Sequence, residues 1–376
     1  MNIAVISNVS IGYAPTYPYE KYLLSKDNNL TVIFHPLVKS GINKSIIKEA
    51  NSIINQYDYK RPIRTHNYIL QFILSIWWII KQKKKFDIIV GMGNLNALSA
   101  LVLKMFNKTN SVIFYTVDYS LNRFDNKILN YVYHLIDRTA INNANYILSV
   151  SERIVKVREV QGIPIGKNLL QPNGVHIHKI KKTSGPVKID KDFYRMIFTG
   201  HITKSKGLDL IIESIKNDRK TYFRPLILDI YGDGPHLPIL KNKVNKYGLS
   251  ELVTFKGDVS NNFILDNLHK YDIGIATYTT DDDFNKYCDP VKVKEYMAAD
   301  LPIIISDVPS VASFISNNHI GILVDNSSAS ISEALRILSS KNVVHTMREN
   351  YRTLQLKLDW EYIFEKNYKI YGYEQK

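Results

Sequence analysis

Short apolar runs alternate with longer amphipathic segments along almost the whole chain of 376 residues. The short runs are rich in β-branched residues and have the length of buried strands. The segments between them carry apolar residues at helical spacing. Strands that alternate with helices are typical of βαβ units with parallel sheets, so the predicted fold class is α/β. The expected strands are residues 3–6, 31–34, 88–90, 112–115 and 146–150, then 196–198, 226–230, 253–255, 273–276, 303–305 and 321–324.

The alternation pauses at residues 178–192, a basic and polar stretch that contains a Gly-Pro pair. Such a stretch is typical of a linker between domains. We therefore predict an N-terminal Rossmann-like domain at 1–177 and a C-terminal one at 193–356. The last segment, 357–376, has aromatic residues at helical spacing and is expected to return to the first domain as a helix.

The longest apolar run is 69–80, which is too short for a membrane-spanning helix of about 20 residues. It is followed at once by the lysine-rich stretch 81–85. One interpretation is a core helix whose cationic end suits the helix dipole. The other is a helix on an anionic membrane surface, with Trp77 and Trp78 at the interface. The sequence leaves both open.

The formal net charge is +14, with Lys and Arg scattered through the chain. We find no zinc-ligand spacing, helix-turn-helix pattern or RNA-binding aromatic signature, so no nucleic-acid partner is expected. An anionic substrate and an anionic membrane surface explain the charge more economically. The single cysteine, Cys288, rules out an intramolecular disulfide and fits a cytoplasmic protein. The N-terminus predicts a buried strand instead of a secretion signal.

The first candidate for chemistry is the loop expected after the strand at 196–198. It contains Gly200, Lys206 and Gly207, and a helix is expected to begin near Leu208. Glycines let the backbone approach a ligand, and a helix N-terminus offers free N–H groups and a positive dipole end. With the charge of Lys206, this loop suits a diphosphate. The alternative is an ordinary βα turn with solvated lysines.

The second candidate is the segment 289–306. Asp289 is expected to cap a helix, with Pro290 in its first position. Lys292, Glu295 and Ala299 recur at helical spacing, so they share one face. The lysine suits a phosphate, and the carboxylate suits the two hydroxyls of a vicinal diol. The alternative is a capped surface helix with a stabilising Lys–Glu pair.

Several short motifs then fall into one recognisable order. They are Asn173-Gly174-Val175, Gly200…Lys206-Gly207, Tyr231-Gly-Asp-Gly-Pro235, Lys256-Gly-Asp-Val259, Lys292-x-x-Glu295-Tyr-Met-Ala-Ala299, and Trp360 in the closing helix. In this order the chain resembles the retaining GT-B glycosyltransferases of family 4, of the kind that build polysaccharides and lipopolysaccharides. The resemblance is strong over the second half and weak over the first. It implies two Rossmann-like domains that face each other across a cleft.

The resemblance also implies a nucleoside-diphosphate sugar bound mainly by the second domain. Lys206 matches the family's phosphate-contacting lysine, and Glu295 matches the glutamate that holds the ribose hydroxyls. The backbone of Gly257, Asp258 and Val259 is expected to contact the base. The rest of the expected donor site is Gly12, on the other side of the cleft, with Gly200, His201, Gly232, Asp289 and Lys292.

The chain departs from the family pattern at three places. His201 stands where the family often has arginine, which weakens the phosphate site although a histidine can still donate a hydrogen bond. Tyr287 stands where the earlier glutamate of the family's glutamate pair normally touches the sugar. Asp289 or Lys292 is expected to substitute, as in a subgroup with the pattern DPxKxxEY. The loop around Gly12 lacks the usual pair of glycines.

In the first half, a polar turn follows the strand expected at 112–115. Asp118 stands at the position where the family often has a histidine of the catalytic region, or at the position next to it. It is expected to position the acceptor or meet the sugar hydroxyls, the alternative being a turn or helix-cap aspartate. Arg123 is expected to meet an anionic acceptor. The predicted catalytic residues are therefore Asp118, Lys206 and Lys292.

The expected reaction moves a sugar from its nucleoside diphosphate to a hydroxyl of a glycan or lipid-linked acceptor. The resemblance implies retention of the anomeric configuration and no cofactor or metal. We interpret Asp281, Asp282 and Asp283 as a solvated loop. Cys288 has no histidine partner nearby in sequence, so a nucleophilic thiol is not expected.

We expect this reaction in cell-surface polysaccharide synthesis of the bacterial type, in the cytoplasm and peripherally on the inner face of the plasma membrane. Two rival functions remain. One is a nucleotide-sugar epimerase with the same fold. The other is a nonenzymatic protein that binds a nucleotide sugar or nucleic acid.

Overall fold

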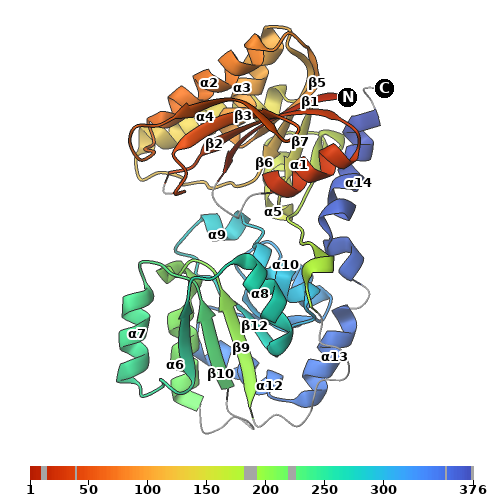
Figure 1. Cartoon of the computed structure of the whole chain (residues 1–376). Helices are drawn as coiled ribbons and strands as arrows, with labels where there is room; N and C mark the ends of the chain where they lie inside the picture. The colour runs from red at the N-terminus through yellow and green to blue at the C-terminus, as the bar shows by residue number, and fades with distance from the viewer. Residues whose placement is uncertain (10–14, 39, 182–192, 219–225, 352–353, 374–376) are drawn as a thin grey trace. The chain divides into compact units, whose positions relative to one another are not determined.

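The computed structural model describes residues 1–9, 15–38, 40–181, 193–218, 226–351 and 354–373 (Figure 1). The chain divides into two compact units. The first unit contains Met1–Pro172 with Ile363–Lys376, and the second contains Asn173–Tyr362. The border thus falls a few residues before the expected one at 177. Buried Ile180 packs in the second unit's core, and the remainder of the predicted linker, 182–192, lies outside the described residues.

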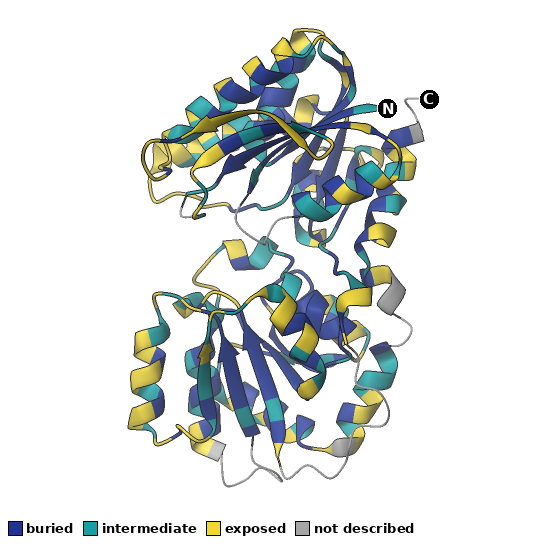
Figure 2. Cartoon of the chain, in the orientation of Figure 1, coloured by how far each residue is buried: buried dark blue, intermediate teal, exposed yellow. Residues whose placement is uncertain are grey.

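In its described part, the first unit has an eight-stranded sheet in the order β4-β3-β2-β1-β5-β6-β7-β8. The five strands predicted here are all present, and the pairs formed by β2, β1, β5, β6, β7 and β8 are parallel. The prediction missed β3, β4 and β8. Strands β3 and β4 form an antiparallel hairpin at one edge, so this sheet is not purely parallel. Every residue of β4 is exposed, which removes the apolar signal of a buried strand (Figure 2). The bounds are β1 (Asn2–Val9), β2 (Asn29–Pro36), β3 (Lys44–Glu49), β4 (Ser52–Asp58), β5 (Phe86–Met92), β6 (Thr109–Thr116), β7 (Tyr146–Ser149) and β8 (Asn168–Leu170).

Helices α2, α3 and α4 lie side by side in the first unit. Helix α2 packs one side on the core, as the core-helix interpretation predicted, and exposes the other. Leu74, Trp78 and Ile79 are buried in the core, so the expectation that Trp78 lies at a membrane interface is wrong. Trp77 is 47% exposed. The helices of this unit are α1 (Thr16–Ser25), α2 (Asn67–Lys81), α3 (Asn94–Met105), α4 (Lys127–Asn143) and α5 (Glu152–Val160).

The C-terminal helix α14 (Trp360–Tyr373) belongs to the first unit from Ile363 onward. Its Tyr371 hydroxyl lies 2.7 Å from that of Tyr19 on α1, and buried Phe364 packs edge-on against Tyr19. Asn367 donates to the Leu170 carbonyl at 2.9 Å. Aromatic packing and buried hydrogen bonds therefore fix the end of the chain to this unit.

The second unit has a six-stranded parallel sheet in the order β11-β10-β9-β12-β13-β14, and all six of its strands were predicted. Because the first strand, β9, lies between β10 and β12, the strand order reverses there. Ligands of such sheets bind at the carboxyl ends of the strands at this point. The strand bounds are β9 (Tyr194–Thr199), β10 (Leu226–Tyr231), β11 (Val253–Gly257), β12 (Ile273–Ala276), β13 (Ile303–Ser306) and β14 (Gly321–Val324).

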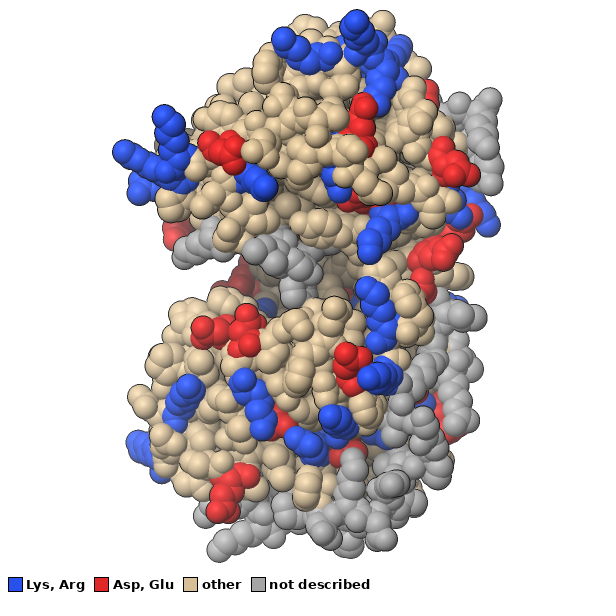
Figure 3. Space-filling model, in the orientation of Figure 1, with Lys and Arg blue, Asp and Glu red and all other residues tan. Residues whose placement is uncertain are grey.

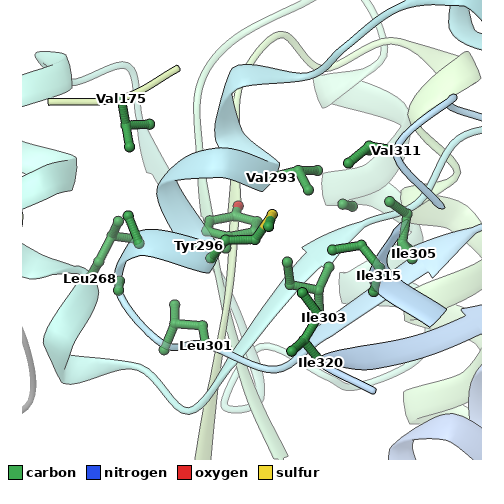
Figure 4. Close-up of a cluster of buried hydrophobic side chains, with 14 of the residues drawn as sticks. Val175, Leu268, Val293, Tyr296, Leu301, Ile303, Ile305, Val311, Ile315 and Ile320 are labelled. Atoms are coloured by element: carbon green, nitrogen blue, oxygen red, sulfur yellow. The ribbon is translucent and has the colours of Figure 1, made fainter. Parts of the chain in front are cut away.

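Helix α10 is anchored firmly to this sheet. Val293 and Tyr296 point into a buried apolar cluster (Figure 4). The Tyr296 ring packs on Gly274 of β12, where an added Cβ would lie 2.4 Å from it. The Tyr296 hydroxyl accepts a hydrogen bond from the Thr199 N–H at 3.0 Å. Helices of this unit are α6 (Leu208–Asp218), α7 (Leu237–Lys246), α8 (Asn261–Asn267), α9 (Phe284–Tyr287), α10 (Val291–Ala298), α11 (Ala312–Asn317), α12 (Ser328–Leu338) and α13 (Lys341–Tyr351).

We expect Tyr296→Phe to lower the free energy of unfolding by about 1–2 kcal/mol, because a buried N–H loses its acceptor. Tyr247→Phe is the matched control: the Tyr247 hydroxyl has no hydrogen bond among the described residues, and its ring lies under Lys216. The control should change stability by less than about 0.5 kcal/mol. Urea unfolding followed by circular dichroism measures both, and equal effects would contradict this role of Tyr296.

Candidate functional site

The loop after β9 is held in place by the loop after β12. It turns through Gly200 and Gly207, both with positive φ, and α6 begins at Leu208 as predicted. The Thr277 hydroxyl donates to the Lys206 carbonyl at 2.8 Å, and the Thr279 N–H donates to the Ser205 carbonyl at 2.9 Å. Lys206 is therefore fixed at the point where the strand order reverses.

The Lys206 ammonium is half-buried and lies over an aromatic ring. Its Nζ is 4.7 Å from the ring centroid of Tyr278 and donates to Asn285 Oδ1 at 3.2 Å. Asn285 is buried on α9 and also donates to the Ser205 and Thr279 carbonyls. Burial lowers the pKa of Lys206 from its ordinary value. Sequence reasoning missed Asn285 because no motif or spacing marks it.

The Lys292 ammonium lies near two aromatic rings, one of which is that of Tyr278. Its Nζ is 3.7 Å from the ring centroid of Phe198 on β9 and 5.2 Å from that of Tyr278. Among the described residues it has no hydrogen bond and no ion pair. Burial lowers the pKa of Lys292 well below its ordinary value, and the positive charge of Lys206 lowers it further. Two cations near one ring, neither of them in an ion pair among the described residues, favour a bound anion.

Glu295 lies three residues after Lys292 on α10, so the two face the same side of the helix. It is buried, and its Oε1 accepts a hydrogen bond from Asn261 of α8 at 2.7 Å. Burial raises the pKa of Glu295, while the bond from Asn261 and the charge of Lys292 oppose that shift. Its Oε2 has no hydrogen-bond partner among the described residues. A carboxylate held by one oxygen can accept hydroxyl hydrogens with the other.

The glycines after β9, β10 and β11 let these loops touch through their backbones. A Cβ on Gly232 would lie 2.1 Å from the Gly200 carbonyl oxygen, and one on Gly234 would lie 2.3 Å from that of Ile202. The Gly232 N–H donates to the Gly257 carbonyl at 2.8 Å. The predicted Gly232 and Gly257 are thus brought together with Gly200. Because these glycines have no side chain, the backbones can pack closely where the three strands end.

Asp289 does not have the local role that the sequence indicated. The helix begins at Val291 and its N-cap position is held by Pro290, so Asp289 lies one residue before the cap. Its carboxylate instead accepts from the Asn173 N–H at 2.7 Å and pairs with Lys294 at 3.1 Å. The helix-cap prediction is therefore wrong, because a tertiary hydrogen bond and an ion pair hold the carboxylate.

The remaining predicted residues differ in their exposure. His201 and Asp258 are exposed, and their side chains have no partner among the described residues. Val259 is half-buried and packs on the apolar core. Gly12 lies outside the described residues.

Asp118 and Arg123 lie in the first unit and form an ion pair with each other. Both side chains are about one third exposed, and the Arg123 guanidinium also lies 5.9 Å from the ring centroid of Tyr133. The structure therefore brings the two predicted acceptor residues together. The charge of Arg123 is offset by its partner.

Cys288 has the environment of an inert thiol. Burial raises its pKa to about 12. In the described ranges no three His, Cys, Asp or Glu side chains lie together in a way that could hold a metal ion. Within the same ranges, none of the helices combines the length and the apolar character that crossing a bilayer requires.

Comparisons with known proteins agree with this architecture. Residues 179–353 match the family model described as Glycosyl transferases group 1. No curated protein matches the sequence significantly. Among solved structures, sucrose-phosphate synthase from Thermosynechococcus elongatus is similar over 100% of this chain and 99% of its own, with 14% identity and a TM-score of 0.76.

Two further structures are similar along the whole chain. HepE from Anabaena, in complex with UDP, covers 98% of this chain and 99% of its own, with 12% identity and a TM-score of 0.72. The lipopolysaccharide outer core galactosyltransferase WaaB covers 100% of both chains, with 16% identity and a TM-score of 0.71. At such identities the likeness shows the fold alone, which is GT-B.

We expect Cys288, the chain's single cysteine, to react with iodoacetamide at pH 8 roughly two to three orders of magnitude more slowly than a free thiol. The reason is that only the thiolate reacts, and a pKa near 12 leaves very little of it. The same chain unfolded in urea provides the control, and mass spectrometry counts the alkylated protein. Equal rates in the folded and unfolded chains would contradict this account.

Proposed function

We propose that this chain, which has the GT-B fold, is a glycosyltransferase of the group 1 family and takes a nucleoside-diphosphate sugar as its donor. One observation carries the proposal. The ammonium groups of Lys206 and Lys292 lie 4.7 and 5.2 Å from the ring centroid of Tyr278, and no carboxylate forms an ion pair with either of them among the described residues. A diphosphate supplies the negative charge that this pair lacks.

The proposed reaction breaks the bond between the sugar's anomeric carbon and the diphosphate oxygen. The electron pair leaves with the diphosphate, so negative charge grows next to Lys206 and Lys292. Fixed cations in a partly desolvated site stabilise such charge strongly. The bound anion also raises the pKa of both ammonium groups and keeps them protonated.

The nucleoside part of the donor fits the neighbouring groups. Oε2 of Glu295 is available for the ribose hydroxyls, and Oε1 is held by Asn261. The backbone at Gly257–Val259 is proposed to contact the base, as in the family that the chain resembles. His201 is proposed to donate a hydrogen bond to the donor, and Gly12 to lie near the diphosphate.

We further propose that transfer retains the anomeric configuration and requires no metal, both of which the resemblance implies. The acceptor hydroxyl attacks on the face from which the diphosphate leaves. Asp118 and Arg123 are proposed to position the acceptor. The anomeric proton coupling of the product in ¹H NMR distinguishes retention from inversion.

The proposed acceptor is a glycan or lipid-linked intermediate of cell-surface polysaccharide synthesis at the cytoplasmic side of a membrane. The similar structures support this choice: WaaB acts on the lipopolysaccharide outer core, and a structure of HepE contains UDP and glucose. Lys and Arg side chains are scattered over both units on the face shown in Figure 3, without one dominant patch. Such scatter does not favour a nucleic-acid groove.

A thermal-shift screen against a panel of nucleotide sugars tests the donor. A ligand at a hundred times its dissociation constant stabilises the folded state by about 2.7 kcal/mol. We expect Lys206→Ala to abolish this shift and to lower kcat roughly 10²–10³-fold, since it removes a fixed cation from the leaving group. Lys204→Ala, an exposed lysine in the same turn, is the matched control and should behave as wild type.

Three outcomes would contradict the proposal. A donor converted to its epimer without any acceptor would assign an epimerase, and binding without turnover would assign a nonenzymatic binder. Equal losses in Lys204→Ala and Lys206→Ala would show that only the general positive charge of the loop matters.

A further inference from the structure

The helix layer of the first unit presents an apolar surface to solvent. Helices α2, α3 and α4 lie side by side, so their outward faces belong to one layer (Figure 1). On α2 the exposed residues follow helical spacing and form one stripe. The exposed apolar side chains of the layer are Ile69, Ile73, Trp77 and Ile80 on α2, Met105 on α3, and Ile128, Leu129, Tyr131, Val132 and Leu135 on α4.

Up to Asp137, helix α4 is amphipathic in the inverted sense, with polar side chains turned toward the protein; only its last turns bury apolar residues, Ala140 and Ile141. Asp137 pairs with the buried guanidinium of Arg158, with one Nη2–Oδ1 distance of 2.8 Å. His134 Nε2 donates to the Leu121 carbonyl at 2.8 Å, and Asn130 Oδ1 accepts from the Phe124 N–H at 3.1 Å.

From Ile128 to Leu135, the opposite side of α4 is apolar and faces solvent. Ile128 is 73% exposed, Tyr131 69% and Leu135 53%. Their spacing of three and four residues places them in one stripe. A stripe of this kind marks a surface that binds another apolar phase or partner.

The charges around this face fit an anionic bilayer. Helices α2 and α3 contain no Asp or Glu, and the only one on α4 is the buried Asp137. Lysines stand at the ends of all three helices, and Lys81 lies 5.3 Å from the ring centroid of Trp77. The basic residues of the three helices and of the loop that follows α2 are Lys81, Lys83, Lys84, Lys85, Lys104, Lys127 and Arg138.

We propose that the outward face of α2, α3 and α4 lies on an anionic bilayer, with α4 as a second membrane-contacting helix beside α2. Apolar side chains enter the headgroup boundary, and the flanking lysines contact lipid phosphates. This inference rests on the proposed function and deepens it. Helix α4 begins at Lys127, directly after the loop that carries Asp118 and Arg123. The acceptor class is therefore a lipid-linked glycan whose headgroup emerges from that bilayer beside these two residues.

Flotation with vesicles of phosphatidylcholine and phosphatidylglycerol tests the surface. We expect wild type to float at low salt and the double variant Ile128→Asp/Leu135→Asp to bind at least tenfold more weakly. The matched control is Ile239→Asp, an isoleucine on α7 of the second unit that is as exposed as Leu135, and this variant should float as wild type. Absence of flotation by wild type, or unchanged flotation of the double variant, would overturn the proposal.

A second measurement reports from α4 itself. The variant Trp77→Phe/Tyr131→Trp carries one exposed tryptophan, at position 131, because Trp78 and Trp360 are buried. We expect brominated lipids to quench the fluorescence of this tryptophan. Absence of quenching would exclude α4 from the bilayer. A double variant that changes the oligomeric mass in light scattering but still floats would assign this face to a second copy of the chain.

The membrane test is separable from the donor test. The double variant should keep the wild-type thermal shift with the preferred nucleotide sugar, since its substitutions lie in the first unit. Failure of wild type to bind any nucleotide sugar would refute the proposed function, whereas the flotation assay would still report whether the protein binds the bilayer.

Discussion

The site depends on keeping two ammonium groups close together in a partly desolvated place. Lys206 comes from the loop after β9 and Lys292 from the first turn of α10, and both lie near the ring of Tyr278. Burial lowers the pKa of both lysines, and the charge of Lys206 lowers that of Lys292 further. Folding therefore holds these cations at an energetic cost, which an anion between them would relieve.

The rest of the second unit fixes these two groups. Tyr296 packs on Gly274 and hydrogen-bonds Thr199, so α10 presents Lys292 and Glu295 from a rigid base. Asn285 holds Lys206 from the other side. Such preorganisation is what a site needs if it is to stabilise charge as it develops on a leaving group.

The sequence predicted the fold best where burial leaves a periodic apolar signal, and all eleven expected strands are present. It missed the hairpin strand β4 because every residue of that strand is exposed. The lysines and Glu295 were visible through motif spacing, whereas Asn285 and Tyr278 act through contacts between loops that no local pattern records. Asp289 was misjudged as a cap because a tertiary partner competes for its carboxylate. The inverted face of α4 needed the structure, since periodicity does not tell which side of a helix faces the core.

The most direct test of the account is a crystal structure with the preferred nucleoside diphosphate bound. We expect diphosphate oxygens within about 3 Å of Nζ of both Lys206 and Lys292, and ribose hydroxyls at the same distance from Glu295 Oε2. A diphosphate bound elsewhere, with Lys292 still lying against Phe198 and making no contact with it, would contradict the account.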